Sequence, residues 1–169
     1  VWRTVVNETV PHEAGHSTNS HASFSPVTDG KHIFASFGSQ GVYCLTMEGD
    51  VVWSRELGKM QTRNAFGERG SPALHANKLI VPWDHEGPSA LIALDARNGE
   101  TLWSTERDEA SAWATPLIVE VGGKTQIVTN GTTVRSYDFE DGKLLWECGG
   151  QVANPIPTPV RVNDFVICM

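Results

Sequence analysis

Short runs that alternate apolar and polar residues follow one another along the chain, and polar turns separate them. Three segments share one layout: an alternating run, a turn that closes on glycine, and a second run that ends in tryptophan four residues later. They are GVYCLTMEGDVVW at 41–53, LIALDARNGETLW at 91–103 and RSYDFEDGKLLW at 135–146. Alternation with period two predicts half-buried strands, and the glycine turns predict that these strands form hairpins.

A serine or threonine followed by proline precedes each hairpin. The four pairs are Ser25-Pro26, Ser71-Pro72, Thr115-Pro116 and Thr158-Pro159, and their prolines lie 46, 44 and 43 residues apart. Each proline opens a short apolar strand, where a missing N–H is tolerated. A small turn and a β-rich run follow. The unit is thus four strands in about 45 residues, which is typical of a β-propeller blade.

The repeat predicts an all-β protein whose 169 residues form a single partial β-propeller domain of four-stranded antiparallel blades. Complete blades are expected at 24–56, 71–105 and 114–148, with one strand of a preceding blade at 1–6 and two strands of a following blade at 158–169. A propeller hides its strand edges by closing into a ring. Further blades, or another copy of the chain, are therefore expected to complete it.

The segment ALDARNGETLW, and more loosely SYDFEDGKLLW, resembles the A-L-D-x-x-x-G-x-x-x-W repeat of pyrroloquinoline-quinone (PQQ)-type propellers. The first repeat departs from this pattern, with Thr46 in place of the aspartate. The family includes quinoprotein alcohol dehydrogenases and the BamB lipoprotein, and its rings usually have eight blades. WD-repeat propellers are the alternative, but Gly15-His16 and Trp83-Asp84 each occur once and off the repeat position.

The resemblance implies two functions. The first is a non-catalytic, BamB-like binding or scaffolding module in the bacterial cell envelope, periplasmic or secreted. The alternative is a fragment of a PQQ-dependent quinoprotein dehydrogenase whose catalytic residues lie outside this span. Such a site would need a tryptophan beneath the quinone, calcium ligands, an aspartate base and usually two adjacent cysteines. Cys44, Cys148 and Cys168 are far apart, so PQQ and Ca²⁺ are expected only under the alternative.

His12-Glu13-Ala14-Gly15-His16 spells the H-E-x-x-H signature of zinc proteases. Two histidines four residues apart bind one zinc only when they project from one face of a helix. Pro11 precedes the motif, Gly15 lies inside it and a polar cluster follows at 17–20, and these features disfavour a helix. The segment is therefore expected in a loop, without zinc-protease activity.

The strand order places the long loops on one face of the propeller, which collects the connections between blades and those between the second and third strands. Binding residues concentrate on such loops. The candidate ligand-facing residues are His12, His16, His21, Arg69, Trp83, Asp84, His85, Arg107 and Trp113. They lie on different loops, so no metal site is expected. Trp53, Trp103 and Trp146 recur at the repeat period instead, and the resemblance implies that they dock blade against blade.

Composition narrows the class of partner. The formal net charge is −7, and the 13 lysines and arginines do not cluster, which argues against nucleic acid. No apolar run approaches the length of a transmembrane helix, and the chain shows no signal-peptide pattern. We therefore expect a protein or small-molecule ligand on the loop face.

Overall fold

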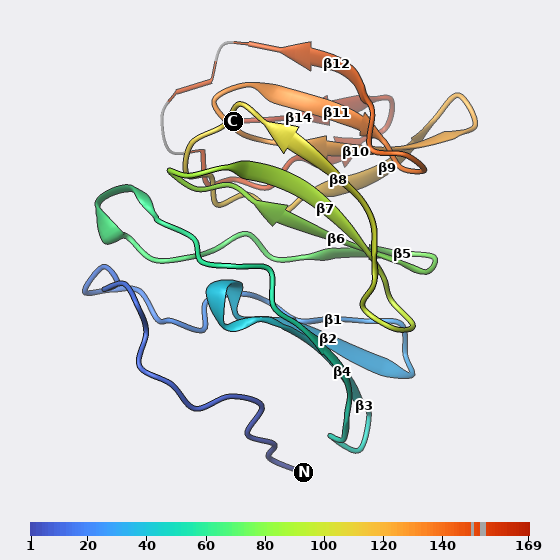
Figure 1. The fold of residues 1–169 in the computed structure, drawn as a ribbon. Coiled ribbons are helices and arrows are strands. Elements are labelled where there is room, and N and C mark those ends of the chain that lie inside the picture. Colours follow the sequence, from blue (N-terminus) through green and yellow to red (C-terminus); the bar gives the residue numbers. More distant parts are fainter. Residues whose placement is uncertain (150, 153–154) are drawn as a thin grey trace.

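A computed structural model describes residues 1–149, 151–152 and 155–169. Figure 1 shows three four-stranded antiparallel sheets stacked one on another, followed by a two-stranded sheet. The strands are β1 Val27–Thr28, β2 His32–Ser36, β3 Val42–Thr46, β4 Val51–Arg55, β5 Ala73–His75, β6 Lys78–Trp83, β7 Ser89–Asp95, β8 Thr101–Arg107, β9 Leu117–Val121, β10 Lys124–Thr129, β11 Val134–Asp138, β12 Leu144–Cys148, β13 Val160–Val162 and β14 Phe165–Ile167. The 3₁₀ turns η1 and η2 cover Gly38–Gln40 and Arg63–Ala65. The all-β blade architecture is therefore confirmed.

The middle sheet, β5–β8, is buried on both faces. On β6, Leu79, Val81 and Trp83 pack in the core cluster shared with the first sheet, while Ile80 packs with residues of the third. Successive side chains of a strand point to opposite faces, so this strand reads as a continuous apolar run. The sheet is held by hydrophobic packing from both of its neighbours.

Each complete sheet carries a β-bulge at the same place. The register between the third and fourth strands shifts directly beside the repeat tryptophan, whose cross-strand partners are Cys44 for Trp53, Ala93 for Trp103 and Ser136 for Trp146. A bulge adds one residue to a strand and increases its local twist. The constant glycine-to-tryptophan spacing therefore includes this extra residue.

The repeat tryptophans explain the repeat glycines. Trp53 Nε1 donates to the carbonyl oxygen of Ala96 at 3.0 Å, and a Cβ on Gly99 would lie 2.7 Å from its ring. Trp103 lies in the same way on the next sheet, where its Nε1 donates to the carbonyl oxygen of Phe139 at 3.3 Å and its ring covers Gly142. The docking role predicted for these two tryptophans agrees with this geometry.

Trp146 differs from the prediction. Its side chain is 40% exposed, and its Nε1 donates to Gln126 Oε1 within its own sheet. A docked tryptophan needs the turn between the third and fourth strands of the following blade, and the β13–β14 sheet has only two strands.

Residues 1–6 also differ from the prediction, because the structure assigns them no strand. A fourth strand pairs with the third strand of its own blade, and none of the described strands pairs with residues 1–6. Trp2 nevertheless occupies the docking position. Its Nε1 donates to the carbonyl oxygen of Met47 at 2.7 Å, and Thr4 Oγ1 donates to that of Gly49 at 2.6 Å. This segment thus makes the side-chain contacts of a fourth strand but not its backbone hydrogen bonds to a third strand.

The serine–proline and threonine–proline pairs link neighbouring blades. The backbone N–H of Ser25 donates to Ser71 Oγ at 2.9 Å, and that of Thr115 donates to Thr158 Oγ1 at 3.3 Å. Each hydroxyl thus bonds to the preceding blade at the point where its own blade begins.

Alanine at Gly99 should destabilise the protein more than alanine at Gly30. Both glycines have positive φ, +74° and +86°, but a Cβ on Gly30 meets nothing within 4 Å. The strained backbone should cost roughly 1–2 kcal/mol at either position, and overpacking against Trp53 should add roughly 1–3 kcal/mol at Gly99 alone. Urea melts of the two variants measure the difference. Equal losses would contradict the docking of Trp53 on this turn.

Acid should weaken the turn between β1 and β2. Asp29 Oδ1 accepts the backbone N–H groups of Lys31 and His32 at 2.8 and 2.6 Å, and these bonds lower the pKa of Asp29 to about 2. Because the pKa of Asp29 is lower in the folded protein than in the unfolded chain, the ionised carboxylate stabilises the fold at pH values above its ordinary pKa. This contribution is lost as the pH falls through about 2. Thermal melts should show Asp29→Asn less stable than the parent near neutral pH, and the difference should shrink as the pH falls through about 2. A difference that persists unchanged in acid would refute this linkage.

Candidate functional site

The two faces of the stacked sheets differ in their connections. Figure 1 shows the segment before β1 and the β4–β5 connection together on the left, whereas the tight β3–β4, β7–β8 and β11–β12 turns lie on the right. The left side is called the loop face below. Within the described residues, no helix is long and apolar enough to cross a membrane.

The H-E-x-x-H segment lies in a loop on this face, as predicted. His12 Nε2 lies 2.8 Å from the carbonyl oxygen of Met60, while His16 Nδ1 lies 2.9 Å from Thr18 Oγ1. The Glu13 carboxylate accepts the backbone N–H of Thr62 at 3.0 and 3.1 Å. The two rings have separate partners, and the glutamate holds the next loop. The motif is therefore a set of loop-to-loop contacts.

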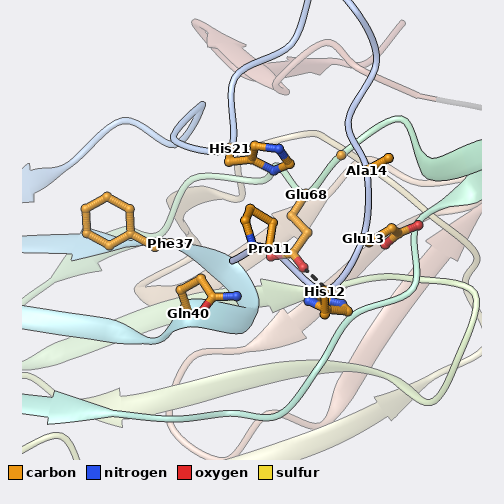
Figure 2. Close-up of a pocket in the computed structure, with 9 residues that line it drawn as sticks. Pro11, His12, Glu13, Ala14, His21, Phe37, Gln40 and Glu68 are labelled. Carbon is orange, nitrogen blue, oxygen red and sulfur yellow. Dashed lines mark ion pairs between the residues drawn. The ribbon is translucent and has the colours of Figure 1, made fainter. Parts of the chain in front are cut away.

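Figure 2 shows a small cavity beside this segment, lined by Pro11, His12, Glu13, Ala14, His21, Phe37, Gln40, Gly67 and Glu68. Its volume is about 30 Å³, which is room for about one water molecule. Glu68 accepts the N–H of Ser39 at 2.6 Å and lies 3.9 Å from His12 Nε2. His12 therefore lines a space too small for an organic ligand, whereas His21 also lines a wider cavity of about 380 Å³ beside residues 3–7.

Four other candidates are buried within and between the blades. Trp83, Asp84, His85 and Arg107 are all less than a tenth exposed, so the structure places them inside the blades and their joints. Trp83 is the last residue of β6 and belongs to the core cluster of the first two sheets. The sequence signal for this position was its spacing from Leu79 and Val81. All three are an even number of residues apart, and period-two alternation places them on one face of the strand.

His85 is fully engaged by its surroundings. Its Nδ1 accepts the backbone N–H groups of Gln61 and Gly87 at 3.2 and 3.1 Å. Its Nε2 lies 3.1 Å from the carbonyl oxygen of Pro88 and therefore carries the proton that it donates. The ring ties the β6–β7 loop to the β4–β5 loop and has no nitrogen left for a metal or substrate.

Asp84 and Arg107 form a buried ion pair. Arg107 Nε and Nη2 donate to the two carboxylate oxygens of Asp84 at 2.7 and 3.0 Å. Arg107 Nη1 also donates to Thr129 Oγ1 and Tyr137 Oη, both at 2.8 Å, in the third sheet. Burial raises the pKa of Asp84, and the guanidinium opposes this shift. The pair is part of the joint between the second and third blades.

The remaining candidates, His16, Arg69 and Trp113, converge on one larger cavity. Together with Phe66 and Ile156 they line a space of about 250 Å³, called the Arg69 pocket below. Its residues come from all four connections that lead into β1, β5, β9 and β13. Phe66 and Ile156 were not predicted from the sequence, where the only signal was a large apolar side chain in a polar loop.

The loops around the Arg69 pocket are bonded to one another. The N–H of His16 donates to the carbonyl oxygen of Phe66 at 3.4 Å, and Trp113 Nε1 donates to that of Gly67 at 3.1 Å. The N–H of Trp113 in turn donates to the carbonyl oxygen of Pro155 at 3.2 Å. The His16 and Phe66 rings meet edge to face at 5.6 Å between centroids. The walls are thus preformed by contacts between successive loops.

Arg69 lies in this pocket without a partner for one of its donors. Its Nε is buried and makes no hydrogen bond to any part of the chain that the structure describes. A buried donor without an acceptor is costly, the more so when it is charged. Such groups are rare in native proteins and call for an explanation.

The described residues contain no group of three histidine, cysteine, aspartate or glutamate side chains placed to hold a metal ion. Asp84 is committed to Arg107. Burial raises the pKa of Cys44 to about 11, so this thiol is protonated at neutral pH.

The stacked four-stranded sheets, the glycine–tryptophan docking and the loop face define a repeat β-propeller of the PQQ-like class. The family model described as outer membrane protein assembly factor BamB matches residues 1–167. The chain therefore belongs to this family. A comparison with curated proteins finds no significant match.

Three solved structures share the fold. BamB from Moraxella catarrhalis has a TM-score of 0.63 and 18% identity over 81% of this chain and 43% of its own length. The quinohemoprotein alcohol dehydrogenase of Comamonas testosteroni has a TM-score of 0.58 and 19% identity over 80% of this chain and 21% of its own. A europium-containing methanol dehydrogenase has a TM-score of 0.55 and 20% identity over 75% and 24%. The chain spans less than half the length of each, and identities this low show the fold alone.

Proposed function

We propose that this chain belongs to a non-catalytic propeller that binds or scaffolds another molecule in the bacterial cell envelope. The observation that carries the proposal is the match to the BamB family model over residues 1–167. A scaffold on a propeller uses the loop face, because the interior of each blade is filled by the core and function resides in grafted loops.

The contacts on the loop face support binding over catalysis. Glu13 accepts from Thr62, Glu68 from Ser39 and Glu86 from Ser111, so each carboxylate fixes a neighbouring loop. The His12 and His85 rings contact neighbouring loops in the same way. A general base must reach a substrate proton, whereas these carboxylates and rings already bond to neighbouring loops. A rigid, preformed surface can bind a partner with little loss of conformational entropy.

Site-specific photocrosslinking in bacterial cells tests the proposal with the whole protein. A photoreactive residue at exposed Ser17, on the loop face, should yield discrete adducts with another molecule. The same residue at exposed Lys31, in the β1–β2 turn of the opposite face, is the matched control. The protein should also fractionate with the periplasm or the envelope. Adducts at Lys31 alone, or a cytosolic location, would overturn the proposal.

A further inference from the structure

We propose that the Arg69 pocket binds a carboxylate that is attached to an apolar or aromatic group. This deepens the proposed function, because it names a ligand chemistry for the same loop face. Arg69 lines the pocket, and its buried Nε finds no acceptor within the described residues. A carboxylate suits this guanidinium because guanidinium–carboxylate bonds are charge-assisted and often bidentate.

The neighbouring acidic side chains do not neutralise Arg69. Glu68 is next in sequence, but its two oxygens accept from the N–H and Oγ of Ser39 at 2.6 and 2.5 Å. Glu86 accepts from Ser111 and pairs with Arg63 at 3.3 Å. The acids of these loops therefore have donors of their own, and no carboxylate of the described residues forms an ion pair with Arg69.

The rest of the pocket is apolar and aromatic. Phe66 and Trp113 lie with ring centroids 6.4 Å apart, and Ile156, which is 57% exposed, stands at the rim. A volume of about 250 Å³ accepts a single ring or a short aliphatic group. Apolar walls with one placed polar group are the usual composition of a small-ligand site. Such a wall also strengthens the ion pair by excluding water.

The net charge of −7 disfavours nonspecific binding of anions elsewhere on the surface. The remaining arginines with described partners are occupied, as Arg107 is by Asp84, Arg97 by Asp95 and Arg135 by Glu109. A carboxylate that carries an apolar group should prefer the Arg69 pocket, because this cation lies beside the aromatic walls of Phe66 and Trp113. Its source is either a free organic acid or the terminal carboxylate of a peptide, since the pocket sees the same chemistry in both.

Calorimetry on the purified whole protein tests the inference with two matched pairs of probes. The first pair is phenylacetate and phenylacetamide, which differ in charge. The second is a short peptide that ends in phenylalanine, with a free or an amidated terminus. Each acid should bind about tenfold or more tightly than its amide, as one charge-assisted bond of at least about 1.4 kcal/mol requires. Tighter binding of the free acid or of the peptide identifies the source.

Arg69→Gln should abolish the preference for the acid, whereas Arg97→Gln, an exposed arginine paired with Asp95, should leave it unchanged. The melting temperature of Arg69→Gln without ligand should not fall, because the variant removes a buried donor without an acceptor. Ile156→Glu provides a second test that perturbs only an exposed rim residue and should weaken acid binding about tenfold through like-charge repulsion.

Equal affinities for acid and amide, retention of the preference in Arg69→Gln, or no binding of either acid near 10 mM would overturn the inference. Crosslinks from Ser17 in cells would still support the proposed function in that case. Conversely, the protein could bind acids selectively and yet yield no envelope adducts. That result would support the ligand of the Arg69 pocket and reject the scaffolding role. The two proposals therefore fail separately.

Discussion

Replacing Arg107 with methionine should destabilise the whole protein by about 3–5 kcal/mol. The variant leaves the Asp84 carboxylate buried without its cation and removes the donors to Thr129 and Tyr137 in the third sheet. Both side chains of the ion pair are at most 5% exposed, so water cannot replace the lost partner. Urea denaturation followed by circular dichroism measures the loss.

Two variants separate loss of the pair from loss of an arginine. Arg97→Met removes a guanidinium that is 74% exposed, and it should have little effect because surface pairs are screened by water. The double variant Asp84→Leu/Arg107→Met should recover much of the loss, since a neutral apolar pair has no buried charge to desolvate. A double variant as unstable as Arg107→Met would show that packing at this joint matters more than charge.

Trp53→Ala should cost about 3–5 kcal/mol, the usual range for truncating a buried large aromatic side chain. The ring packs between the first and second blades, touches Phe34 at 6.0 Å between centroids, and covers Gly99. Truncation would leave a cavity that neighbouring strands cannot fill without shifting. Thermal and urea melts of the whole protein provide the measurement.

Trp53→Phe is the control for the hydrogen bond alone. It retains an aromatic ring at the blade joint but loses the bond from Nε1 to the carbonyl oxygen of Ala96. The net cost of one such bond is about 1 kcal/mol, so this variant should be far milder than Trp53→Ala. Similar losses for the two substitutions would mean that the indole N–H, and not ring burial, holds the blades together.

The polar residues that the sequence assigned to the loop face have three different structural roles. Asp84 and Arg107 neutralise each other inside the blade joint, and His85 ties two loops together. His16 and Arg69 line a preformed cavity. Residue type does not distinguish these outcomes, because an ion pair and a ligand site use the same side chains. What distinguishes them is whether a partner is already in place, which makes Arg69 the residue of interest.

The amino-acid sequence alone determined the blade architecture. Period-two alternation, glycine turns and the repeated tryptophans act over a few residues and recur at a constant interval, so each copy reinforces the reading of the others. The loop position of the H-E-x-x-H segment was determined in the same local way, since Pro11 and Gly15 disfavour a helix wherever the segment lies. The outward location of the blade-to-blade loops follows directly from strand order.

Only the tertiary structure decided how the loop-face side chains pair. Asp84 meets Arg107 across 23 residues of chain, and Trp113 meets Gly67 across 46. These encounters depend on the twist and stacking of whole sheets, which no short window of sequence specifies. The exposure of Trp146 also depends on tertiary structure, because it is set by the turn of the neighbouring sheet. For Arg69, the lack of an acceptor at Nε became evident only after the nearby carboxylates had been placed against their own donors.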